Sequence, residues 1–489
     1  MMTPQDCPRP PPRAPFSARA GIRGQSRRRW MCVGPMLVLL CPLVGQDTCG
    51  GDDDDEPTPP LNNWWDGLVL VSDGNGPRLS VLRLQDGALL WDYNAFDYHP
   101  DYCSNANEEP CLLWHAGHKR IGDRDVVDFT LTSNASGIIN MTSAWRVPLD
   151  APDTPLFEVS GFDFSGLSAG CTSSPDLTCV PQTAATLENG CSVKFSHDFR
   201  ILEEDPEAGW IRFAIADSTN FRILGAYLDY ASGSHCATVE WSLDASVREW
   251  DATCPPNAIQ LVEDDTGKGL LVTCRNLYSN PGTGQIQMWR NGGTWERPIW
   301  SRAWSFPDPD AYTDPAFINT PHGGRIEVDS QGNYQLLYAH SNGLGTDWGE
   351  GDQGTVGTAL SPSLFSPPNY LGDEWIGDSL EDPTFGFLRS VDLLPGGQRV
   401  VGDSRTFAAL PDLPGRVYIL SPQTTTDTAD GGYWSQDFSH MNLDHINDQV
   451  LAVYECGWNQ IFSAERIAPP SFGSYLTAAV EAEGLSCGL

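Results

Sequence analysis

Short runs of alternating apolar and polar residues, separated by turn residues, fill most of the chain from Trp64 onward. The first such unit runs through 68–71, turns at 72–76, continues through 79–84 and ends at 89–91. Alternation with a period of two, interrupted by Gly, Asn and Asp, indicates β-strands joined by tight turns. An apolar stripe with the 3.6-residue period of a helix occurs only near 475–482. The pattern therefore predicts an all-β protein.

Similar units recur at intervals of about sixty residues, as expected for a repeat architecture. They lie at 112–147, 191–231, 258–300, 318–341, 386–420 and 437–465. Several four-stranded units in series favour a β-propeller, in which radial repetition protects the strand edges. Two β-sandwiches in tandem are the alternative, but they predict a linker in mid-chain, and none is visible between 63 and 489. We expect one propeller domain over 63–489 with six or seven four-stranded blades, six if the first and last segments share a closing blade.

The segment before this domain has the composition of an export leader. Three consecutive arginines, Arg27 to Arg29, precede an apolar run over 31–44 that is too short to span a bilayer as a helix. This layout resembles a twin-arginine signal and equally an ordinary secretory signal. Residues 1–49 are accordingly predicted to be a leader, and the acidic, Pro-rich residues 50–62 a linker. Cys49 is a candidate lipid anchor, although Gln46, Asp47 and Thr48 before it are not the small residues of a lipobox.

Charge and cysteine content narrow the function classes. The formal net charge is −35, which disfavours binding to nucleic acid or to anionic lipid, so contact with a membrane is expected only through a lipid anchor. Of fourteen cysteines, ten follow residue 100, an even number that favours disulfides in an exported chain. Pairs Cys103–Cys111 and Cys171–Cys179 are predicted as local disulfides, because each encloses only a short polar loop. The location predicted is periplasmic, outer-surface or extracellular.

Histidines and arginines that stand early in a unit are the candidates for chemistry, because the first strand of each propeller blade lines the central channel. On that basis His197, followed by Asp198, and His322, followed by Gly323 and Gly324, should converge in the channel together with Arg389. The pairs His115/His118 and His440/His445 have odd spacings, which on a strand send the two side chains to opposite faces. Neither pair is expected to hold a metal, and no metal site or cofactor motif is predicted.

A histidine at the head of blades, the string His197-Asp198 and the turn from Asp329 to Asn333 resemble the bacterial arylsulfotransferase-like propellers. The resemblance covers about 190–345 as motifs and the remainder only as blade rhythm. It implies an enzyme that moves a sulfuryl group between phenols through a histidine nucleophile. His322 would be the nucleophile on this resemblance, and the residues that bind the sulfate would be His197 and Arg405, with Asn220 and Arg222 as further candidates.

Simpler interpretations stand beside this one. His197-Asp198 can be a structural pair that stabilises a blade, and His322 can be a turn residue. The alternative function is then a non-catalytic propeller that binds a ligand at the cell surface or serves as a scaffold. The expected partner is a small aryl ester or an unknown surface ligand, and the protein is expected to be a monomer.

Overall fold

A computed structural model describes most of the propeller region predicted from the sequence. The chain divides into two compact units, residues 1–58 and 59–489, and every described residue belongs to the second. The described residues are 67–74, 76–99, 103, 111–133, 141–165, 167, 193, 195–250, 254–274, 284–306, 320–328, 332–341, 355–376, 388–394, 397–404, 414–420, 450–458, 460–467 and 487. The predicted leader with its Cys49, the whole of the predicted linker and Arg405 lie outside them.

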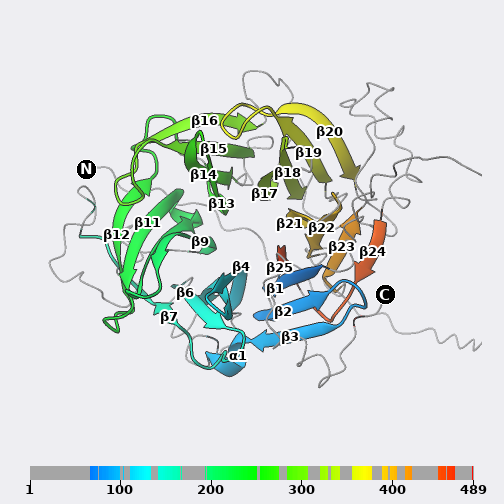
Figure 1. Ribbon diagram of the computed structural model, residues 1–489, viewed down its shortest axis with the longest axis horizontal. Coiled ribbons are helices and arrows are strands. Elements are labelled where there is room, and N and C mark those ends of the chain that lie inside the picture. Colours follow the sequence, from blue (N-terminus) through cyan, green and yellow to red (C-terminus); the bar gives the residue numbers. More distant parts are fainter. Residues whose placement is uncertain are drawn as a thin grey trace, which may run out of the picture. The chain divides into compact units, whose positions relative to one another are not determined.

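Six sheets, each built on four antiparallel strands, stand side by side around a central axis and form a β-propeller (Figure 1). The strands of blade 1 are β25 (Ile461–Ile467), β1 (Leu68–Asp73), β2 (Arg78–Arg83) and β3 (Leu89–Asn94), and those of blade 2 are β4 (Leu112–Ile121), β5 (Arg124–Ser133), β6 (Met141–Pro148) and β7 (Phe157–Val159). Blade 3 consists of β9 (Ser196–Asp205), β10 (Trp210–Asp217), β11 (Arg222–Asp229) and β12 (Cys236–Leu243), with β8 (Gly161–Asp163) added parallel to β12.

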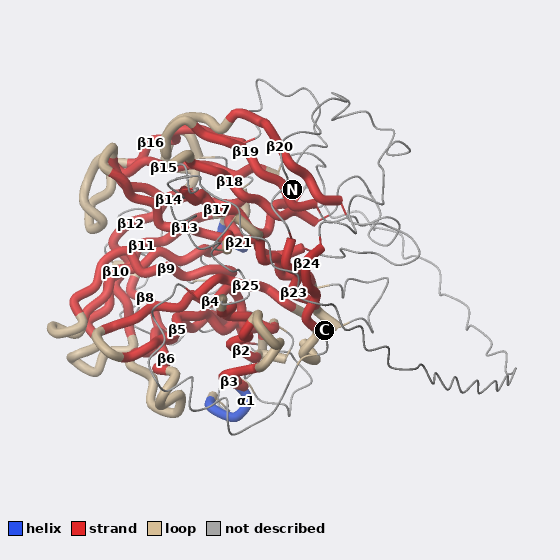
Figure 2. The backbone as a smooth tube through the Cα atoms, turned by 45° about the vertical axis from the view of Figure 1, so that its right-hand side comes forward, coloured by secondary structure: helices blue, strands red, loops and turns tan. Residues whose placement is uncertain are grey.

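The other three blades follow in chain order. Blade 4 consists of β13 (Pro256–Asp264), β14 (Gly267–Cys274), β15 (Gln285–Asn291) and β16 (Trp300–Phe306), and blade 5 of β17 (Thr320–Val328), β18 (Tyr334–Ser341), β19 (Thr355–Ser361) and β20 (Asn369–Ile376). Blade 6 consists of β21 (Leu388–Leu393), β22 (Arg399–Asp403), β23 (Arg416–Leu420) and β24 (Val450–Tyr454). The described helical segments are short, namely α1 (Ala95–Tyr98) and the 3₁₀ turn η4 (Ser218–Asn220). Strands therefore dominate the described chain (Figure 2), and the all-β prediction is confirmed.

The last strand of the ring, β25, closes blade 1 by pairing with β1. Leu68 lies opposite Ile467, so strands from the two ends of the domain share one sheet. The predicted unit at 437–465 is thus divided: β24 completes blade 6, and β25 becomes the innermost strand of blade 1. Of the two blade numbers predicted from the sequence, six is correct.

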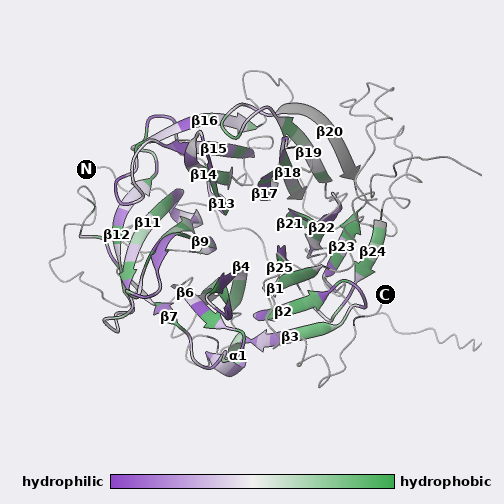
Figure 3. Ribbon diagram, in the orientation of Figure 1, coloured by the Kyte–Doolittle hydropathy of each residue, from purple (hydrophilic) through white to green (hydrophobic). Residues whose placement is uncertain are grey.

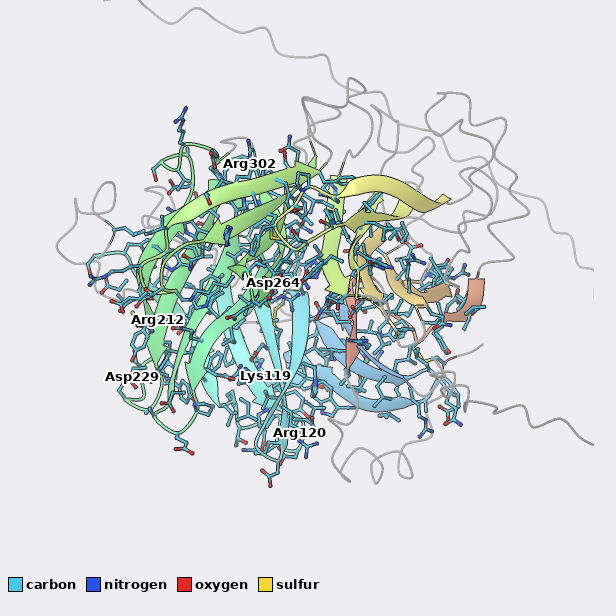
Figure 4. The ribbon with its side chains drawn as sticks, turned by 45° about the horizontal axis from the view of Figure 1, so that its top comes forward. Lys119, Arg120, Arg212, Asp229, Asp264 and Arg302 are labelled. Carbon is cyan, nitrogen blue, oxygen red and sulfur yellow. A yellow bond between two sulfur atoms is a disulfide. The ribbon has the colours of Figure 1, made fainter. Side chains whose placement is uncertain are left out.

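Six hydrophobic clusters hold the ring together, one between each pair of neighbouring blades. One cluster joins Val81 of blade 1 to Phe129 of blade 2, and another joins Val400 of blade 6 to Val69 of blade 1. Figure 3 shows the matching hydrophobic colour along strands such as β1 and β23. Charged side chains such as Arg212, Asp229 and Arg302 lie on the outer parts of blades 3 and 4 (Figure 4). The core is therefore distributed around the axis rather than concentrated in one centre.

Three disulfides join described cysteines: Cys103–Cys111, Cys254–Cys274 and Cys456–Cys487. The first confirms a sequence prediction, whereas the predicted pair Cys171–Cys179 lies outside the described residues. Disulfides persist in oxidising compartments, so they indicate a non-cytoplasmic location. No helix in the described part of the chain has the length and hydrophobicity that a bilayer-spanning segment requires.

Candidate functional site

The innermost strand of every blade changes register at the same level of the channel. Pairing with the second strand shifts within 461–463, 113–116, 196–199, 256–259, 321–323 and 388–390. A bulge of this kind turns a side chain away from the regular alternation of the strand. Each shift contains one side chain that contacts at least one of the others, and we call these six the bulge ring: Trp114, His197, Asn257, His322, Arg389 and Phe462.

The polar half of the bulge ring is centred on His322, which is fully buried. Arg389 Nη1 lies 3.1 Å from His322 Nδ1, and Asn257 Nδ2 donates to the His322 carbonyl oxygen at 2.7 Å. Because a guanidinium can only donate, His322 Nδ1 must accept. In its neutral form His322 therefore carries its proton on Nε2 and is a donor at that atom.

His197 has the opposite arrangement of donor and acceptor. Its Nδ1 lies 2.6 Å from Ser218 Oγ, and that hydroxyl donates its proton to the Pro256 carbonyl oxygen. Since a hydroxyl has only one proton, Ser218 must accept from His197 Nδ1–H. Neutral His197 thus has an unprotonated Nε2, which is the nucleophilic form of an imidazole.

Aromatic side chains complete the ring. The Trp114 ring lies 4.1 Å from the His197 ring and 4.3 Å from the Phe462 ring, measured between centroids. The Arg389 guanidinium carbon lies 4.7 Å from the centroid of Phe462. The six side chains are at most 5% exposed, and contacts link them one after another around the axis from His197 to Asn257. Cationic and neutral N–H donors next to flat apolar rings suit a small oxyanion attached to an aromatic group.

The structure brings some of the candidate residues from the sequence together in the channel and places others elsewhere. His197 and His322 lie in the bulge ring, as does Arg389. Asn220 Nδ2 and Arg222 Nε both donate to the Asp217 carboxylate, at 2.9 Å and 2.8 Å, so these two side chains hold the end of β10. Arg405 lies outside the described residues, next to Ser404, whose Oγ accepts from Arg389 Nε at 3.3 Å.

Sequence reasoning missed Trp114, Asn257 and Phe462 altogether. A weak signal was present, since each stands directly after an apolar residue or proline near the start of its strand, as do His322 and Arg389. Gly323, directly after His322, lies against the next blade. An added Cβ at Gly323 would lie 2.8 Å from Ser390 Cα and 2.9 Å from the Arg389 carbonyl oxygen. Gly323 therefore allows blades 5 and 6 to approach closely.

A cavity of about 220 Å³ occupies the channel directly next to the bulge ring. Several of its lining residues follow a bulge-ring residue along the same strand, namely His115, Ala258, Gly323 and Ser390. Small side chains and glycine at this level leave the space open. Arg200, Arg325 and Glu465 line the cavity further along the strands.

Ion pairs at that further level connect four blades. Arg200 Nη2 lies 2.6 Å from Glu465 Oε1, and Arg325 Nη1 lies 3.0 Å from Asp392 Oδ2 and 3.7 Å from Glu465 Oε2. Burial would raise the pKa of Glu465, but the two guanidiniums outweigh it and lower the pKa to about 2. For Asp392, burial outweighs Arg325 and raises the pKa to about 6.

Asp198 and His115 complete this buried set. Burial raises the pKa of Asp198 to about 6 despite its pairing with Arg200. The side chain of Asp198 accepts from the backbone N–H of Phe199 and of Ile259, which ties blade 3 to blade 4. Burial, followed by the charge of Arg200, lowers the pKa of His115 to about 3, so its imidazole is neutral at physiological pH. Within the described residues no three His, Cys, Asp or Glu side chains come together as a metal site requires.

Comparisons with known proteins assign the chain to no family. No protein-family model matches the chain, and no curated protein matches it. Among solved structures it is similar to an exo-β-1,3-galactanase from Phanerochaete chrysosporium, with 9% identity, a TM-score of 0.33 and coverage of 59% of this chain and 56% of that one. The chain thus spans little more than half of the galactanase.

Two further solved structures are similar over more of their own length. An α-L-arabinanase from Cellvibrio cellulosa has 13% identity, a TM-score of 0.35 and coverage of 63% of this chain and 91% of that one. A putative 6-phosphogluconolactonase from Bacteroides fragilis has 10% identity, a TM-score of 0.39 and coverage of 82% of this chain and 98% of that one. Similarity this low carries no information about the activity or ligand of the present chain.

Proposed function

We propose that this propeller binds a small aryl ester at the bulge ring and moves its sulfuryl group to a second phenol through a histidine. The observation that carries the proposal is the pair of opposed imidazole tautomers at one level of the channel. His197 has an unprotonated Nε2, and His322 presents an N–H next to the guanidinium of Arg389. One histidine is thus suited to attack and the other to bind an oxyanion.

The reaction would proceed in two half-reactions. Nε2 of His197 attacks sulfur, a nitrogen–sulfur bond forms, and the bond from sulfur to the aryl oxygen breaks with its electron pair leaving on the phenolate. The oxygen of a second phenol then attacks sulfur, the nitrogen–sulfur bond breaks, and its electron pair returns to Nε2 while the phenol proton is released. Arg389 and His322 would stabilise the negative charge on the sulfuryl oxygens in both steps.

This proposal exchanges the roles that the sequence suggested for the two histidines. The resemblance gave His322 the nucleophilic role, but His322 Nδ1 is occupied by a cationic donor and its Nε2 carries the proton. His197 is held by a hydroxyl that can only accept from it. The hydrogen bonds therefore favour His197 as the nucleophile and His322 as part of the oxyanion site.

The proposal is tested by measuring transfer of the sulfuryl group from 4-nitrophenyl sulfate to phenol. Release of 4-nitrophenolate is the readout. His197→Asn keeps an N–H for Ser218 but removes the nucleophile, so it should abolish transfer and the sulfuryl-enzyme adduct seen by intact mass spectrometry. Arg389→Lys should lower the transfer rate about a hundredfold, as expected when an oxyanion donor is lost. His118→Asn, which changes a histidine paired with Asp125 at the end of β4, is the matched control. Unchanged transfer by the His197→Asn protein would refute the proposal.

A ligand-binding protein without catalysis is the second candidate, and the burial of the bulge ring favours it. Side chains that are at most 5% exposed and contact one another leave little room for two successive phenols. This candidate predicts that 4-nitrophenyl sulfate binds to the wild-type protein without release of 4-nitrophenolate. Binding is then weakened by Arg389→Lys and insensitive to His197→Asn.

A further inference from the structure

Two phenylalanines next to the contact between His197 and Ser218 have a left-handed backbone. Among the described residues they are the non-glycine residues with positive φ: Phe195, directly before β9, has a φ of 54°, and Phe221, directly after η4, has a φ of 55°. A side chain with a Cβ is disfavoured in this region, which glycine usually occupies. Such strain persists only where surrounding contacts hold it, so the contacts of each phenylalanine show what the strain maintains.

Phe195 is held through its ring. This ring lies edge-to-face against the Trp114 ring, 4.9 Å away between centroids, and against the His197 ring, 4.7 Å away. Phe221 is held through its backbone, because its carbonyl oxygen accepts from Trp250 Nε1 at 2.9 Å. The strain at Phe195 is therefore coupled to the position of a ring that packs on His197, whereas the strain at Phe221 is coupled to the end of the turn.

Phe195 stands on the solvent side of His197. The His197 side chain is 2% exposed, and two of its neighbours, Ser218 and Trp114, are 5% and 3% exposed. Phe195, in contrast, is only half-buried. Of these three neighbours, Phe195 is thus the one that can move into solvent without opening the core of a blade.

The observed position of the Phe195 ring is only weakly favoured. Its two edge-to-face contacts stabilise it, and the strained backbone opposes it with a free energy of similar size. When the ring moves away, the backbone can return to an ordinary conformation, so relief of strain offsets the lost ring contacts. Phe195 is therefore poised between a closed and an open position.

We propose that Phe195 is a gate that controls the access of small molecules to Nε2 of His197. In the closed position its ring covers the imidazole. In the open position the imidazole faces solvent while Ser218 and Trp114 still hold it in place. The proposal concerns access to His197 alone, so it goes beyond the proposed function and does not require sulfuryl transfer.

Labelling of the full chain with diethyl pyrocarbonate tests the gate, because this reagent attaches an ethoxycarbonyl group to an unprotonated imidazole nitrogen. The rate at each histidine is read by peptide mass spectrometry at neutral pH. Phe195→Gly removes the ring and suits the left-handed backbone. It should raise the labelling rate of His197 about tenfold, which corresponds to a change of about 1.4 kcal/mol in the balance between closed and open positions.

Phe221→Gly is the matched control. It relieves the same kind of strain at the end of η4, so it should leave the labelling rate of His197 unchanged. Equal rates in the wild type and in Phe195→Gly would overturn the proposal. An equal increase in both glycine variants would also overturn it, by showing that loss of either ring loosens the region.

Two other histidines in the same sample distinguish a local gate from a general loosening of the ring. His235 has a side chain that is 63% exposed, and it should be labelled rapidly in every variant. His322 is fully buried, with Nδ1 against Arg389, and it should be labelled slowly in every variant. An increase at His322 equal to that at His197 would show that the whole bulge ring opens, and the gate would be refuted.

A conservative variant tests whether the ring itself is responsible. Phe195→Tyr keeps the ring, so labelling of His197 should stay as slow as in the wild type, and rapid labelling would contradict the gate. Phe195→Asn also tolerates the left-handed backbone and replaces Phe195→Gly if that variant does not fold.

The labelling and transfer experiments can fail independently. A gate that responds to Phe195→Gly in a protein without transfer would refute the proposed function alone. Transfer by a protein whose His197 is labelled at the same rate with and without the Phe195 ring would refute the gate alone.

Discussion

At the scale of single residues, position in a bulge and choice of hydrogen-bond partner decide what each histidine can do. His197 and His322 occupy equivalent places on β9 and β17 and are both buried. One contacts a hydroxyl whose proton is already given to a carbonyl, and the other contacts a guanidinium. Identical side chains at equivalent positions thus have opposite tautomers because their neighbours differ.

Gly323 provides a test at this scale. Gly323→Ala places a Cβ within 2.9 Å of the Arg389 carbonyl oxygen, a backbone atom that can move only with its strand. Overpacking of this kind typically costs about 1–3 kcal/mol, and urea unfolding should show a loss in that range. Gly292→Ala, where the nearest atom would be 3.7 Å away, is the control and should change the free energy of unfolding by much less. Equal stability of the two variants would contradict the close approach of blades 5 and 6.

At the scale of elements, side chains of the innermost strands bind the backbone of the next innermost strand. Ser390 accepts from Ala464 N–H, and Asp392 accepts from Arg466 N–H. Both hydrogen bonds connect blade 6 to blade 1. Gln260 makes two such bonds, accepting from Ile326 N–H at 2.7 Å and donating to the Ile326 carbonyl oxygen at 2.9 Å. Because innermost strands of neighbouring blades do not pair as a sheet, these side chains satisfy their backbone groups.

Gln260→Leu tests this role. The change keeps a side chain of similar size but leaves the N–H and carbonyl of Ile326 without these partners in a half-buried place. Loss of a partner for one buried group costs about 1–3 kcal/mol, so the free energy of unfolding should fall by about 2 kcal/mol or more. Gln85→Leu, in an exposed turn, is the control. If both variants unfold at the same urea concentration as the wild type, the side-chain bonds between blades do not stabilise the ring.

At the scale of the whole domain, ring closure depends on contacts between remote parts of the chain. β25 pairs with β1, and Cys487 lies within the cluster between blades 6 and 1. Glu465 on β25 also reaches across the channel to Arg200 of blade 3. Strand pairing, a hydrophobic cluster and a buried ion pair thus close the propeller together.

The pH dependence of stability should report on this closure. The pKa of Glu465 is about 2 in the folded chain against an ordinary value of 4.5. Ionised Glu465 therefore makes its full contribution to the free energy of unfolding above pH 4.5. This contribution, about 3 kcal/mol, is lost as the pH falls towards 2. The difference in free energy of unfolding between wild type and Glu465→Gln should narrow between pH 5 and pH 3. Urea unfolding at each pH measures this difference, and Glu263→Gln, at an exposed position, is the control. A difference that does not change with pH would count against the ion pair of Glu465.

Much of this architecture is predictable from the sequence because the signals are local. Alternation with a period of two, together with Gly, Asn and Asp at turns, indicates strands wherever it occurs, and a short loop between Cys103 and Cys111 makes their pairing the simplest one. His197 and His322 were identifiable as channel candidates because each stands at the start of a repeat unit. The strand class, the repeat and part of the bulge ring follow from such patterns.

Only the tertiary structure decided how remote residues combine. Six blades rather than seven result from β25 pairing with β1, a contact that no local pattern specifies. Asn220 and Arg222 lie close to His197 in sequence but bind Asp217, whereas Arg389 of blade 6 contacts His322 of blade 5. Alternation assigns a side chain to one face of its own strand. Which side chains meet around the axis depends on two further things: the bulge in each innermost strand, and the strand of the next blade that packs beside that bulge.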